Sequence, residues 1–91
     1  MNAAQPAEAF AIPLDSLELG KRAHIESIDW AALEETAARR LRQFGFDEGV
    51  TIEALHLGPF GRDPIAIRVG RMTVAIRRKH ASAVRVIPLI R

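Results

Sequence analysis

Residues 55–78 read LHLGPFGRDPIAIRVGRMTVAIRR, and this stretch decides the fold. Two short runs in which apolar residues alternate, 65–69 and 72–76, are separated only by Gly70 and Arg71. Alternating runs joined by a two-residue loop predict a β-hairpin. Glycine in the first loop position favours a type II′ turn, because that position needs a positive φ.

The two-residue loop also predicts how the strands of the hairpin pair. The alternating apolar residues then share one face, in the opposed pairs Val69–Met72, Ile67–Val74 and Ile65–Ile76. A slip of one residue would turn this apolar face outward, so the pattern and the turn favour the same register. Because an isolated hairpin is only marginally stable in water, the rest of the chain must cover this face.

Three further segments are expected to be strands, at residues 21–28, 50–57 and 84–89. The second should be bulged near residues 55–57, where the alternation of apolar and polar side chains fails. Five short strands leave no long free edge if they close into a barrel. We therefore expect a mainly β fold of the small α+β kind, a five-stranded barrel with one inserted helix.

The helix is expected over residues 29–44, with Asp29 as its N-cap and Gly45 as its left-handed stop. Its apolar residues recur every three or four positions and form one stripe, Trp30, Leu33, Ala37, Leu41 and Phe44. Short helical turns are expected at residues 14–17, where two leucines lie three apart, and at residues 78–83. The helix should cover one side or one opening of the barrel.

The length of 91 residues fits one small domain, which we place at residues 13–91 after a flexible tail at residues 1–12. The chain has no cysteine, which excludes disulfides and thiolate metal ligands. No apolar run approaches the length of about 18 residues that a membrane span needs, and the first residues lack the features of a secretory signal. These features predict a cytoplasmic protein that does not insert directly into a membrane.

The net charge of +2 is unevenly distributed. Residues 1–45 hold five basic and seven acidic side chains, a balance of −2, whereas residues 46–91 hold eight basic and four acidic ones, a balance of +4. The second half therefore offers a basic surface that can steer an acidic partner or nucleic acid. Because the excess is modest, the favoured interpretation is a solvated exterior in which arginine serves solubility.

The sequence carries no pattern that is typical of catalysis. Its three histidines, His24, His56 and His80, have neither HxH nor HxxxH spacing, and surface histidines are the favoured interpretation. No serine or threonine lies in a context that supplies a base and an orienting group. The loop Gly58–Pro64 is not followed by the GK[ST] of a phosphate loop. We therefore expect a protein that is not an enzyme.

Binding is the better hypothesis, and its first candidates lie in the loop Gly58–Pro64. Phe60 stands at the centre of this loop, close to Arg62, and exposed aromatic and arginine side chains are common interface anchors. The alternative is that Phe60 folds back and caps the mouth of the barrel. Arg68 and Arg77, on the outer face and at the end of the hairpin, are further candidates for partner contact, against the alternative of a solvated face.

Two other kinds of partner are a second copy of the chain and a nucleic acid. The small outer side chains of Ala66 and Ala75 would let a second copy of the chain approach closely, which allows a homo-oligomer. A small basic nucleic-acid-binding barrel ranks lower, because the chain lacks the interleaved aromatic side chains that stack on bases.

Several short motifs keep a distinctive order and spacing across residues 14–86. They are Leu14-x-x-Leu17-x-x-Gly20, Ile28-Asp29, Leu41-Arg42-Gln43-Phe44-Gly45-Phe46, Gly49-Val50-x-Ile52, the loop Gly58–Pro64, Ile65-x-Ile67-Arg68-Val69 and Val74-Ala75-Ile76-Arg77. Taken together they resemble the FeoA family, the small cytoplasmic partner of the bacterial ferrous iron transporter FeoB. The resemblance implies an SH3-like barrel with an inserted helix, in agreement with the barrel expected from the strand pattern.

The resemblance implies a small accessory and regulatory protein that binds the FeoB-type transporter and modulates Fe²⁺ transport, with no required cofactor. It also implies weak binding of a divalent metal, Fe²⁺ or Zn²⁺, through residues that the sequence does not identify. The same domain type occurs at the C-terminus of DtxR-like metalloregulators, so a metal-responsive regulatory module that acts through a separate repressor is the alternative. With no helix-turn-helix before the barrel, the chain itself is not expected to be a repressor.

Overall fold

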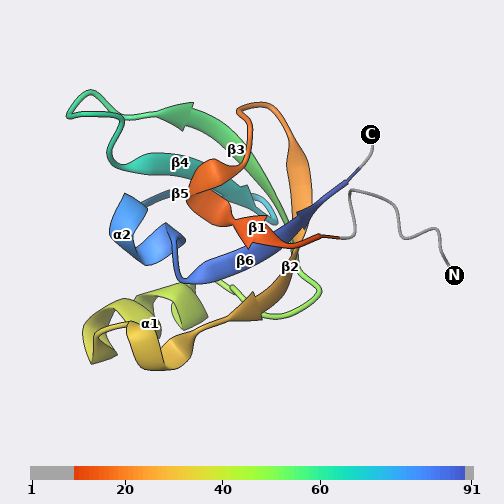
Figure 1. Ribbon diagram of the computed structural model, residues 1–91. Coiled ribbons are helices and arrows are strands. Elements are labelled where there is room, and N and C mark those ends of the chain that lie inside the picture. The colour runs from red at the N-terminus through yellow and green to blue at the C-terminus, as the bar shows by residue number, and fades with distance from the viewer. Residues whose placement is uncertain (1–9, 90–91) are drawn as a thin grey trace, which may run out of the picture.

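The computed structural model describes residues 10–89 and shows one antiparallel sheet with two short helices (Figure 1). The strands are β1 (Ile12–Pro13), β2 (Arg22–Ile28), β3 (Thr51–Leu57), β4 (Ile65–Val69), β5 (Met72–Ile76) and β6 (Val84–Pro88). They lie in the order β1-β6-β2-β3-β4-β5. The helices are α1 (Glu35–Gln43) and α2 (Arg78–Ala81), and single 3-10 turns occur at Leu14–Ser16 and Trp30–Ala32. The predicted mainly β class with one longer helix is confirmed.

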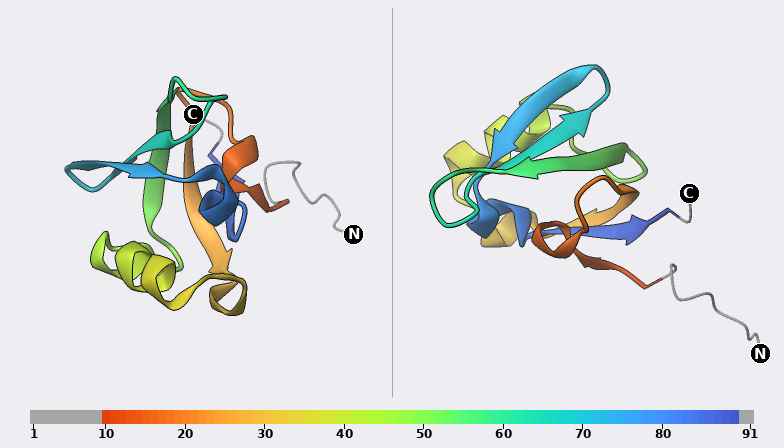
Figure 2. Two further views of the ribbon diagram at one scale, coloured as in Figure 1. Left: turned by 90° about the vertical axis from the view of Figure 1, so that its left-hand side faces the viewer. Right: turned by 90° about the horizontal axis from the view of Figure 1, so that it is seen from above.

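The sheet folds over on itself and encloses the core. Figure 2 shows β3, β4 and β5 in one layer and β1, β2 and β6 in the other. The largest fully buried side chains come from both layers and from the segments that close the ends, Phe46, Leu14, Ile25, Leu41, Ile52, Ile67, Val84 and Val86. Apolar burial is the main stabilising term in a domain of this size, so this one core holds all the strands together.

The hairpin of β4 and β5 has the predicted register. Ile65 pairs with Ile76, Ile67 with Val74, and Val69 with Met72. Gly70, the first loop residue, has a φ of +60°. Arg71, the second loop residue, is not among the residues with positive φ, so the turn has the II′ pattern. One prediction is wrong in part, because Met72 is 46% exposed rather than buried. It sits at the tip of the hairpin, beyond the reach of the core.

The helix begins later than predicted. Trp30–Ala32 form a 3-10 turn, Leu33 is extended, and α1 starts only at Glu35. Asp29 makes no side-chain capping bond, and its backbone N–H instead donates to Ala83 O over 2.8 Å. Since this bond holds the chain against the start of β6, and Leu33 turns toward the core, the backbone leaves the helical path before it enters α1.

The helix ends as the sequence predicts. Gly45 has a φ of +89°, and its N–H donates to Arg42 O, while the N–H of Phe46 donates to Leu41 O, both over 3.0 Å. These two bonds make a Schellman motif, in which a left-handed glycine lets the chain reverse and satisfies the last carbonyls. The motif directs Phe46 into the core, where it is 2% exposed.

Two details of the strands complete the comparison with the sequence. The predicted bulge in β3 is confirmed, since the register with β4 shifts between Ala54 and His56. A sixth strand was not predicted: Ile12 and Pro13 pair with Val86 and Arg85 of β6. A two-residue strand is too short to show alternation. Residues 1–9 of the expected tail, and residues 90–91, lie outside the described part of the chain.

The fold predicts a sharp contrast between two residues of the hairpin. Replacing Ile67, which is fully buried, with alanine should lower the free energy of unfolding by about 2–5 kcal/mol, because it leaves a cavity in the core. The Met72→Ala change at the exposed tip should cost well under about 1 kcal/mol. Urea denaturation measures both, and equal losses would contradict the assigned core.

Candidate binding surface

The loop Gly58–Pro64 is closed on itself and holds Phe60 outward. The N–H of Gly58 donates to Pro64 O over 2.7 Å. A Cβ at Gly58 would lie 2.7 Å from Asp63 O, so only glycine lets the two ends of the loop approach this closely. Phe60 is 82% exposed, which makes the alternative of a core cap wrong. Arg62, with a φ of +69°, lies exposed beside it.

Asp63 ties this loop to the start of α2. Its Oδ1 accepts a hydrogen bond from the backbone N–H of Arg78 over 3.0 Å. The side chain of Arg78 in turn reaches Asp15, with Nη2 and Oδ2 3.8 Å apart. The loop, α2 and the turn at Leu14–Ser16 are therefore linked at one end of the molecule (Figure 1). Arg77, the residue directly before α2, lies at this same end.

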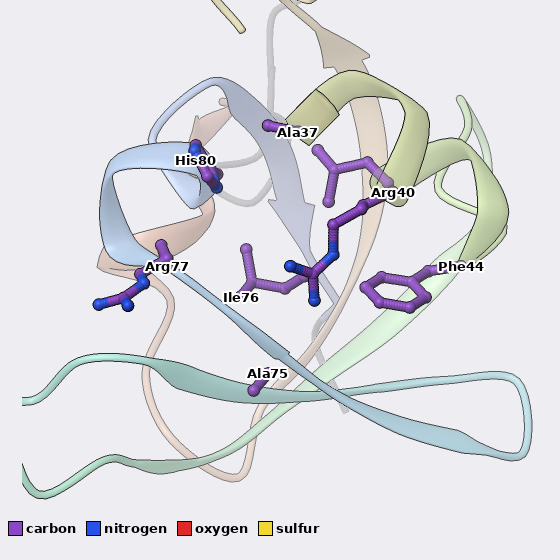
Figure 3. A pocket seen from close by; sticks show the side chains of 8 residues that line it. Ala37, Arg40, Phe44, Ala75, Ile76, Arg77 and His80 are labelled. Carbon is purple, nitrogen blue, oxygen red and sulfur yellow. The ribbon is translucent and has the colours of Figure 1, made fainter. Parts of the chain in front are cut away.

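A small pocket opens beside α2, between α1 and β5 (Figure 3). Its volume is about 130 Å³, and it is lined by Ala37, Arg40, Leu41, Phe44, Ala75, Ile76, Arg77 and His80. The guanidinium of Arg40 lies 5.7 Å from the centre of the Phe44 ring. Among the described residues, neither Arg40 nor Arg77 has an acidic partner. The pocket thus has an apolar floor and a basic rim.

Of the four residues predicted to contact a partner, the structure brings three to one end. Phe60 and Arg62 lie on the loop, and Arg77 lies at the adjoining start of α2. Arg68 lies elsewhere, on the outer face of β4, with its Nε 3.6 Å from Glu53 Oε1. The sequence missed Arg40, because only the packing of α1 beside β5 shows that it shares a pocket with Arg77.

The three histidines that could bind a metal lie on different elements of the fold. His24 lies on β2, His56 near the end of β3 and His80 on α2. Within residues 10–89, no three His, Asp or Glu side chains are grouped so that they could hold a metal ion. In that same part, no helix is long and apolar enough to cross a membrane.

Comparison with known proteins assigns the chain to a family. The model of the FeoA domain matches residues 12–88. The chain belongs to the FeoA family. A search of curated protein sequences gives no significant match. The family assignment agrees with the strand order, since a solved FeoA protein is described as an SH3 domain protein.

Solved FeoA structures match over most of this chain. FeoA of Chlorobium tepidum is 32% identical, with a TM-score of 0.74 over 86% of this chain and 70% of that one. FeoA of Stenotrophomonas maltophilia, solved with zinc, is 32% identical, with a TM-score of 0.69 over 85% of this chain and 88% of that one. A manganese-dependent transcriptional repressor, 19% identical, shares the fold alone, with a TM-score of 0.75 over 97% of this chain and 45% of the repressor.

The link between Asp63 and α2 leads to a direct test of how the loop is held. Asp63→Ala should lower the free energy of unfolding by about 0.5–2 kcal/mol, the usual cost of losing a helix cap. It should also speed hydrogen exchange at the Arg78 amide, which loses its acceptor. Asp63→Asn keeps an oxygen acceptor and serves as the matched control. Unchanged exchange at Arg78 in the alanine variant would show that the bond does not hold the loop.

Proposed function

We propose that this chain is a small cytoplasmic accessory protein of ferrous iron uptake, which binds the cytosolic part of an FeoB-type transporter and modulates Fe²⁺ transport. The observation that carries the proposal is the FeoA domain match across residues 12–88. The Stenotrophomonas maltophilia relative is described as a candidate ferrous iron transport activating factor. In this role the chain acts by binding, without a reaction of its own and without a required cofactor.

We assign the contact with the transporter first to Phe60 and Arg62. Phe60 is a large apolar side chain that the described part of the chain leaves in water, at 82% exposure, on a loop that two hydrogen bonds hold in place. Burying a preorganised aromatic side chain against a partner gains apolar contact at little cost in chain entropy. Arg77 lies at the same end and extends the contact, whereas Arg68 contributes only if the partner also covers the outer face of β4.

The proposal predicts the effect of removing the exposed aromatic ring. Phe60→Ala should weaken binding to the cytosolic domain of an FeoB-type transporter about tenfold or more, since an anchor of this kind contributes over about 1.4 kcal/mol. Arg62→Ala should also lower the affinity for that domain. Calorimetric titration of the purified chain against that domain gives the dissociation constants, and the unfolding curve of each variant should match that of the unchanged chain.

Phe10 provides the matched control, because it is also an exposed phenylalanine, at 64%, but lies on the segment that leads into β1. Phe10→Ala should bind as the unchanged chain does. No binding by the unchanged chain at micromolar concentration would contradict the proposal. Equal losses in the Phe10 and Phe60 variants would remove the loop from the contact.

A further inference from the structure

The pocket between α1 and β5 has the size and the charge to hold one acidic side chain. Its volume of about 130 Å³ is well below the several hundred Å³ of a typical cofactor or drug-sized site. Its rim carries Arg40 and Arg77, both exposed and both without an acidic partner in the described chain. The other arginines and lysines near it are already paired, Arg39 with Glu35, Arg78 with Asp15 and Lys79 with Glu34.

His80 also lines this pocket and adds a polar side chain to its wall. Its Nε2 atom is buried and has no hydrogen-bond partner, and the nearest carboxylate oxygen, on Glu34, is 4.0 Å away. Buried polar atoms nearly always find a partner, and an unpaired one is costly.

The strand that borders this pocket has a free edge. β5 is the last strand of the sheet and is bonded to β4 alone. In a hairpin with a two-residue loop, the backbone groups of Met72, Val74 and Ile76 face β4, so those of Thr73 and Ala75 face outward. Both have small, exposed side chains that leave the edge accessible. An extended segment can pair with such an edge by adding a strand.

We propose that an extended acidic segment of a partner protein adds to the free edge of β5 and places one carboxylate in the pocket beside Arg40, with the exposed and unpaired Arg77 at the rim able to turn toward it. The pocket opens at the end of β5, since Ala75, Ile76 and Arg77 line it together with α1 (Figure 3). Side chains alternate along a strand, so a paired segment presents every second residue to the same side. The same segment can therefore use the backbone edge and fill the pocket.

A carboxylate fits this site better than a phosphate does. Phosphate sites in proteins draw on clusters of free backbone N–H groups, commonly at a helix start. Here the N–H at the start of α2, on Arg78, already donates to Asp63. The pocket floor is formed by apolar side chains, which suit the methylene groups of a glutamate, and its charged groups are two guanidinia that match a carboxylate.

A short peptide tests this inference without the transporter. The peptide is a blocked heptamer of alternating valine and glutamate, and its control replaces each glutamate with glutamine. NMR titration of the ¹⁵N-labelled full chain should show the glutamate peptide binding at least roughly tenfold more tightly than the glutamine peptide. Hydrogen exchange at the Thr73 and Ala75 amides should slow in the complex, because an added strand supplies their acceptors.

Four arginine variants test which positive side chains bind the glutamate of the peptide. Arg40→Gln and Arg77→Gln should each weaken binding of the glutamate peptide roughly tenfold. Arg39→Gln, on the same helix, and Arg71→Gln, at the tip of the hairpin, should bind within about twofold of the unchanged chain. All four side chains are exposed, so the spectra of the free variants should show the unchanged fold.

Several results would overturn the inference. These are no peptide binding at millimolar concentration, equal binding of the glutamine peptide, equal losses in all four variants, or unprotected Thr73 and Ala75 amides. Binding of inorganic phosphate or GTP that depends on Arg40 and Arg77, in place of peptide binding, would reassign the pocket to a phosphate group.

This inference deepens the proposed function, and rests on it only for the identity of the partner. Binding of the transporter domain that depends on Phe60 but not on Arg40 would leave the proposed function intact and remove the transporter from this pocket. Peptide binding without any binding of the transporter domain would leave this inference intact and contradict the proposed function.

Discussion

The pairing of Ile65 with Ile76 is the contact on which both the core and the candidate binding surface depend. It places the apolar side chains of β4 and β5 on the inner face of the curled sheet, where both isoleucines are almost fully buried. It also brings the loop before β4 next to the start of α2 after β5, so that Asp63 can accept from Arg78. A slip in this register would expose the core residues and separate the loop from α2 at the same time.

The sequence predicts those elements in which a local pattern decides the structure. The hairpin, its turn at Gly70, the bulge in β3 and the glycine stop at Gly45 depend on neighbouring residues, and all are confirmed. The start of α1 was predicted wrongly, because a bond from Asp29 to Ala83, far away in the sequence, competes with the helical path. β1 was missed because its two residues are strand only through their pairing with β6.

The candidate binding surface was only partly visible in the sequence. Phe60 and Arg62 stand out because large and charged side chains interrupt a run of turn formers. Arg40 shows no such signal, because it lies on a helix beside Arg39 and Arg42, and nothing local distinguishes one arginine from the next. Its position follows from packing: Arg39 is paired with Glu35, whereas Arg40 lies over Phe44 at the rim of a pocket that β5 completes.

The two surfaces adjoin each other at one end of the molecule. Asp63 connects the Phe60 loop with α2, and α2 forms one wall of the pocket that holds Arg77 and His80. A partner that covers the loop would therefore meet the free edge of β5 and the basic pocket as well. The opposite side of the hairpin differs, since Arg68 is already paired there with Glu53.

The most direct measurement is an NMR map of the full chain, ¹⁵N-labelled, with the unlabelled cytosolic domain of an FeoB-type transporter. The account predicts that amide shifts and slowed hydrogen exchange gather at residues 59–62, at residues 73–80 and along α1 near Arg40. Changes confined to the face that carries Glu53 and Arg68, or spectra that do not change at all, would contradict it.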